Sequence, residues 1–73
     1  MDLARKKVIL GNILQALEDA YEGCMIELSI SVKVKDVEGV EVLKKRAIEL
    51  EAKIAAAKEL QAGQEKEATD AGS

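Results

Sequence analysis

The segment MIELSISVKVKD, residues 25–36, alternates apolar and polar side chains without a break. In a β-strand such an alternation places one set of side chains on each face, and β-branched residues are common in strands. A strand with one apolar and one polar face is typical of antiparallel sheets. The sequence therefore predicts a strand over about residues 25–35, with an apolar face made of Ile26, Leu28, Ile30, Val32 and Val34.

The residues before this segment, about 2–22, have the spacing of an amphipathic helix. One stripe of apolar side chains has steps of three, four or seven residues, and a second stripe lies beside it. An arc this wide is expected to be buried against more than one neighbour. Asp2 is favourably placed near the helix start, and Gly23 is predicted to end the helix. The first stripe contains Leu3, Leu10, Leu14, Leu17 and Tyr21, and the second contains Ile9, Ile13, Ala16 and Ala20.

A second helix is predicted over about residues 37–62. Asp36 is suited to cap its first turn, and Glu38 lies near the positive end of the helix dipole. Steps of three and four residues give it the seam of a coiled coil or of an antiparallel helix pair. Gly63 is expected to end this helix, and residues 63–73 are expected to form a disordered tail. The seam residues are Val40, Leu43, Ala47, Leu50, Ile54 and Ala57.

These elements predict a single α+β domain over residues 1–62, with a helix–strand–helix protomer. An alternative is a helix–β-hairpin–helix arrangement, in which KVKDVEGVEVL forms two short strands around a turn at DVEG. In both cases a long strand keeps an unpaired edge, which natural proteins cover.

The simplest cover for that edge is a second copy of the chain. Two copies of the strand, antiparallel and centred on Ile30, place Glu27 opposite Lys33, so that opposite charges pair. This register predicts a homodimer or a higher homo-oligomer, with the helices packed on the apolar face of the ribbon. The predicted interface consists of Ile26, Leu28, Ile30, Val32, Val34, Leu43, Ala47, Leu50 and Ile54.

The composition argues against most kinds of catalytic and metal chemistry. The chain has one cysteine and no histidine, so it cannot form an internal disulfide, and it lacks the usual ligands of zinc and the base of a catalytic triad. No glycine-rich phosphate loop is present. We therefore expect no enzyme activity, no cofactor and no metal site. We interpret Cys24 as a small apolar residue at the start of the strand; the alternative is an intermolecular disulfide or a redox role.

Charge and hydropathy bear on partners and location. A net charge of −3 and a single aromatic residue disfavour binding to nucleic acid. The apolar runs are too short for a membrane span, which needs about 20 residues. A free cysteine and the lack of an export signal predict a cytoplasmic protein.

Three hypotheses for function remain. The first is a non-catalytic interaction or assembly protein that acts as an obligate homo-oligomer. The second is an inhibitor of the kind that mobile elements encode, which blocks a larger protein or sequesters a small anionic ligand between subunits. The third is a β-ribbon DNA-binding regulator that offers the polar strand face to a groove. The candidate contacts of an anionic ligand are Arg5, Lys6, Lys7, Lys44, Lys45 and Arg46.

Overall fold

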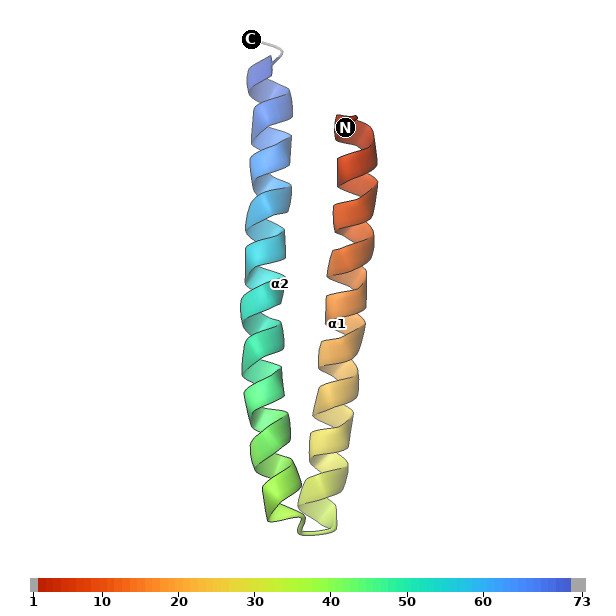
Figure 1. Cartoon of the computed structure of the whole chain (residues 1–73), viewed down its shortest axis with the longest axis vertical. Helices are drawn as coiled ribbons and strands as arrows, with labels where there is room; N and C mark the ends of the chain where they lie inside the picture. Colours follow the sequence, from red (N-terminus) through yellow and green to blue (C-terminus); the bar gives the residue numbers. More distant parts are fainter. Residues whose placement is uncertain (1, 72–73) are drawn as a thin grey trace.

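The chain folds into a hairpin of two long helices. The computed structural model describes residues 2–71, and it describes the side-chain surroundings of residues 2–63. Helix α1 (Leu3–Lys33) and helix α2 (Val37–Ala71) run antiparallel, side by side, and a short turn joins them at one end (Figure 1). The molecule measures 57 × 15 × 15 Å. Within residues 2–71 there is no strand, so the predicted α+β fold is wrong.

The predicted strand over residues 25–35 is instead the last part of α1 and the start of the turn. The reason lies in the helical period. In a helix, residues four apart share a face, so an alternating segment separates into two apolar ridges on different faces. One ridge contains Ile26, Ile30 and Val34, and the other contains Leu28 and Val32. The alternation therefore marks a helix with two apolar faces.

Two further expectations fail with the strand. The alternative β-hairpin at DVEG is wrong, because α2 begins at Val37. The strand ribbon centred on Ile30, which would have paired Glu27 with Lys33 of a copy, has no strand from which to form. One polar side chain of the segment forms a hydrogen bond within the helix: the Ser29 hydroxyl donates to the carbonyl oxygen of Met25, one turn earlier, at 3.1 Å.

Two glycines that were expected to end helices lie inside them. Gly23 is in the middle of α1, and α2 continues past Gly63 to Ala71, through the range in which we expected a tail. Glycine in a helix costs about 1 kcal/mol relative to alanine, which long helices with a packed seam tolerate. Residues 72–73 of the expected tail lie outside the described residues.

The seam predicted for the second helix is confirmed, as is the first stripe of the first helix from Leu10 onward, and the two form the core; Leu3, predicted at the start of that stripe, is exposed. Apart from Gly11 and Gly39, every buried or half-buried residue among residues 2–63 follows steps of three and four along one stripe of each helix. We call these two stripes together the core seam. Its centre is a cluster of Cys24, Leu43 and Ala47, against which Tyr21, Leu28 and Leu50 pack. The core seam consists of Leu10, Leu14, Leu17, Tyr21, Cys24, Leu28 and Ser31 in α1, and Val40, Leu43, Ala47, Leu50, Ile54, Ala57 and Gln61 in α2.

The turn closes by a Schellman motif. Lys35 has φ 60°, the left-handed region, and its N–H donates to the Val32 carbonyl at 3.2 Å. The N–H of Asp36 donates to the Ser31 carbonyl at 2.9 Å, which completes the motif. Asp36 then caps α2, as predicted, because its Oδ1 accepts a hydrogen bond from the Gly39 N–H at 3.0 Å.

A hairpin of this shape has little interior. Its radius of gyration is 16.7 Å, whereas a compact domain of this length is expected near 11 Å. Five apolar residues are buried among the described positions, and none of them is completely enclosed. Most of the surface of each helix outside the core seam is therefore exposed.

Candidate helix-binding interface

Helix α1 exposes an unusual number of large apolar side chains. Of thirteen such residues among the described positions, eight lie in α1, one is its C-cap residue Val34, and four lie in α2. Ile13 is 49% exposed and Ile30 is 56% exposed, although isoleucine is usually buried. Exposed apolar side chains that gather on one face mark a binding site on many soluble proteins.

Four of these thirteen residues lie on one line along the helix, which we call the outer face of α1. Each member of the line immediately precedes a member of the core seam, except that Val34 stands at the turn. Because neighbouring helix residues differ by about 100° in direction, the outer face points about 100° away from α2. The line keeps the steps of three and four that helix partners recognise. It contains Ile9, Ile13, Ala16, Ala20, Gly23, Glu27, Ile30 and Val34.

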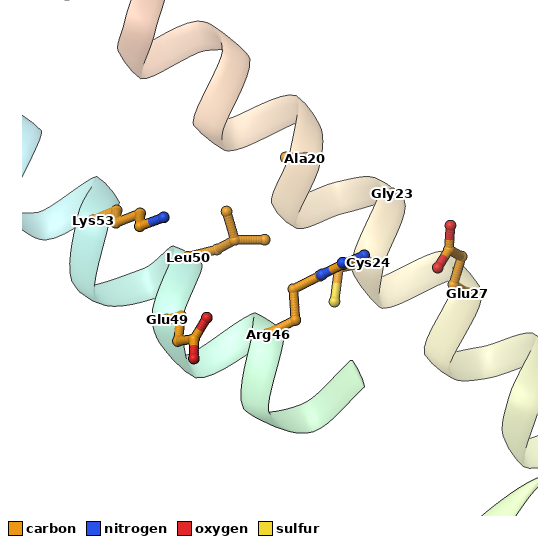
Figure 2. A pocket seen from close by; sticks show the side chains of 8 residues that line it. All are labelled: Ala20, Gly23, Cys24, Glu27, Arg46, Glu49, Leu50 and Lys53. Carbon is orange, nitrogen blue, oxygen red and sulfur yellow. The ribbon is translucent and has the colours of Figure 1, made fainter. Parts of the chain in front are cut away.

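A groove of about 420 Å³ runs between the two helices along this side. Figure 2 shows Ala20, Gly23 and Glu27 on its α1 wall and the side chains of α2 opposite. The Arg46 side chain extends from α2 toward α1, and Leu50 points the same way. The small residues of α1 leave the groove open, because they fill little space.

The charged side chains of the groove balance. Glu27 and Glu49 contribute two negative charges, and Arg46 and Lys53 contribute two positive charges. Such a neutral set does not favour a small anion, whereas it suits a partner that brings matching charges of its own.

The structure divides the residues that we predicted for the oligomer interface into two sets. Leu43 and Ala47 are buried and Leu50 and Ile54 are half-buried, all within the chain's own core seam. Leu28 packs against the same core. The remaining four, Ile26, Ile30, Val32 and Val34, are exposed. Of these, Ile30 and Val34 lie on the outer face.

The basic residues predicted to contact an anionic ligand are exposed, but one hairpin does not bring them together. Arg5, Lys6 and Lys7 lie in the first turns of α1, at the end of the hairpin away from the turn. Lys44 and Lys45 lie near the turn end, roughly 35 Å away by the rise of a helix. Among the six, Arg46 lines the groove.

A polar contact spans the two helices near the middle of the hairpin. The Tyr21 hydroxyl donates to Oε1 of Glu51 at 2.8 Å. This hydrogen bond, together with partial burial and the negative charge of Glu51, raises the pKa of Tyr21 above its usual value near 10. The contact shows the relative level of the helices, because residue 21 of α1 lies beside residue 51 of α2.

Cys24 is buried in the core seam, and its thiol donates to the Leu43 carbonyl oxygen at 3.3 Å. Its position next to Leu43 and Ala47 fits the role of a small apolar residue. Among the described residues, no three side chains of histidine, cysteine, aspartate or glutamate are grouped so that they would hold a metal ion.

The second half of the outer face is what sequence reasoning missed. The stripe of Ile9, Ile13, Ala16 and Ala20 is visible in the sequence, and its continuation through Gly23, Glu27, Ile30 and Val34 has the same spacing. The interpretation of residues 25–35 as a strand interrupted it. The usable signal was that the stripe stays one residue ahead of the core seam along the whole of α1.

Comparison of the chain with protein-family models, with curated proteins and with solved structures finds no match. In the described part of the chain, neither helix has a stretch that is both long and apolar enough to cross a bilayer.

Proposed function

We propose that this chain is a non-catalytic assembly protein that acts as a homo-oligomer, and that its hairpins associate through the outer face of α1. The observation that carries the proposal is the exposure of Ile9, Ile13 and Ile30 along one line of the helix. Helix seams with this spacing bury their apolar residues against other helices.

The amount of exposed surface supports the same conclusion. A compact monomer of this mass is expected to expose about 4,400 Å², whereas the hairpin exposes 5664 Å². The excess, about 1,300 Å², is larger than the ~800 Å² that each partner contributes to a standard protein–protein interface. Association of two or more hairpins would bring the exposed surface per chain to an ordinary value.

Sedimentation equilibrium at micromolar concentrations tests the proposal. We expect the intact chain to sediment as a dimer or a larger assembly. We expect Ile13→Lys to shift it toward the monomer, because a lysine on the outer face would place its charge in an apolar layer between the hairpins. A helical wild-type chain that remains monomeric throughout this range would contradict the proposal.

Ile48→Lys is the matched control. Ile48 is 66% exposed, more than Ile13, but it lies on α2 and does not line the groove. We expect Ile48→Lys to leave the assembly intact. Equal disruption by both variants would assign the association to general surface hydrophobicity and not to the outer face.

A further inference from the structure

The outer face of α1 has nearly the same pattern in both directions. Starting from either end, it presents two β-branched residues, Ile9 and Ile13 on one side and Val34 and Ile30 on the other. The positions between them are small, with the exception of Glu27. A pattern that repeats when it is reversed is what an antiparallel pair of identical helices requires, because each residue then meets its mirror position.

An antiparallel pair centred between residues 21 and 22 satisfies this pattern. The apolar positions of such a pair alternate between a and d of the heptad. In an antiparallel pair, each a position lies in one layer with a d position of the other helix. Ile13 then faces Ile30 of the second copy, and Ala20 faces its Gly23. Small residues in the middle allow the two backbones to approach closely, while the large residues fill the space at both ends.

Glu27 favours this orientation over the parallel one. In a parallel pair, Glu27 of both copies would occupy one layer and place like charges together in a region of low dielectric constant. In the antiparallel pair, Glu27 faces Ala16 of the second copy, and each carboxylate stays beside the groove that holds its own Arg46. A single polar residue in a seam commonly fixes the register and direction of helix pairing.

The same two-fold axis also places complementary residues of the two α2 helices opposite each other. The hydrogen bond between Tyr21 and Glu51 places these residues at one level, so the axis passes α2 near residue 51. On the groove side of α2, this axis brings Lys53 opposite Glu49 of the second copy. Farther out, it brings Leu60 opposite Val42, and both of these are exposed in the hairpin.

We propose that the occupant of the outer face is a second copy of this chain, docked antiparallel about a two-fold axis near Tyr21 and Glu51. The two hairpins then form a four-helix bundle in which every neighbouring pair of helices is antiparallel. The angle of about 100° between the core seam and the outer face of α1 fits the corner of such a bundle. This inference rests on the proposed function and adds the orientation and register of the assembly.

Cross-linking of cysteines tests the orientation. The lone native cysteine is first replaced by Cys24→Ser, and Asn12→Cys or Lys33→Cys is then introduced at exposed positions that flank the outer face. In the antiparallel pair, residue 12 lies beside residue 33 of the second copy, whereas the two copies of residue 12 are roughly 28 Å apart. We expect mild oxidation of the mixed variants to give the heterodimer, and either variant alone to give little product.

A dominant product from Asn12→Cys alone would show a parallel pair and overturn the inference, as would equal yields from all combinations. Sedimentation of the same samples separates this result from failure of the proposed function. A dimer with the wrong cross-link retains the proposed function and loses the inference, while a monomer loses both.

Charge reversal tests the register of α2. Glu49→Lys and Lys53→Glu each place like charges together twice in the dimer, and we expect each to weaken dimerisation about tenfold. The double variant restores opposite charges and should restore the wild-type dissociation constant. Failure of the double variant to recover would overturn the register.

The chain contains a matched control for this exchange. Glu41 and Lys45 form another pair four residues apart on α2, exposed and outside the groove. Reversing them makes the same change within the helix, with the same small effect on helix stability. We expect the dissociation constant to stay unchanged in both single variants and in the double variant.

Discussion

At the scale of single residues, the cap of α2 makes two glycines respond differently to substitution. A Cβ at Gly39 would overlap the carboxylate of Asp36 that caps the helix, whereas a Cβ at Gly11 meets no other atom within 4 Å. We expect Gly11→Ala to raise the free energy of unfolding by about 1 kcal/mol, as helix propensity predicts. Gly39→Ala should gain less or lose stability, because displacement of the cap costs about 0.5–2 kcal/mol. Urea denaturation at one protein concentration measures both.

The cap itself can be removed to check this reason. In an Asp36→Ala background, Gly39→Ala no longer meets a carboxylate, so it should regain the stabilisation seen at Gly11. Equal effects of both glycine variants in the wild-type background would show that the cap does not restrict position 39.

Tyr21 provides a prediction for pH dependence. Its hydrogen bond to Glu51 favours the protonated phenol, so the pKa of Tyr21 is higher in the folded chain than in the unfolded chain. The stability that this contact contributes is therefore complete below pH 10 and is lost as the pH rises through the folded-state pKa. Glu51→Gln should move the pKa of Tyr21 back toward 10. Because Tyr21 is the only aromatic residue, ultraviolet absorbance reports its ionisation directly.

The measurement has a clear contrary result. If the wild type and Glu51→Gln ionise at the same pH, the hydrogen bond between the helices does not hold the phenol proton. Loss of stability near neutral pH in place of alkaline pH would point to a different titrating group.

At the scale of the helices, small residues set how closely α1 and α2 approach. Ala47 is buried beside Cys24 and Leu43, while Ala52, five residues later on the same helix, is exposed. Ala47→Leu must force the helices apart, and we expect it to lower the free energy of unfolding by about 1–3 kcal/mol. Ala52→Leu adds the same side chain at an exposed position and should change stability by less than about 0.5 kcal/mol. A similar effect at both sites would show that the seam has room for larger side chains.

The two helices differ in how far the sequence predicts them. The seam of α2 beyond Leu43 and the first stripe of α1 from Leu10 onward follow from spacing alone, because only a helical period fits there, whereas Val40 and Leu43 also belong to the alternative hairpin. Residues 25–35 satisfy two periods at once. Their alternation fits a strand, and the same residues at steps of four, such as Ile26 and Ile30, fit a helix with two apolar faces. The local pattern does not choose between them, and the continuous hydrogen bonding of one long helix decides the outcome.

At the scale of the whole molecule, the sequence predicts a partner but does not predict which surface would receive it. A 73-residue chain with no internal disulfide has few ways to bury enough apolar area alone. Which apolar residues remain exposed depends on which ones are buried between the two helices of the same chain. Leu43 and Leu50 were expected to meet another chain, but they pack against α1 of their own chain, and Ile13 and Ile30 are the residues left exposed.

The turn also has a consequence for how the chain can exchange partners. Lys35 occupies the left-handed position that glycine usually fills, which makes the closed turn about 1–2 kcal/mol less favourable than it would be with glycine. The open alternative is a single continuous helix, whose two halves would complete their core seams with the halves of another open copy. The residue at the turn therefore contributes to the free-energy difference between a closed hairpin and a domain-swapped dimer.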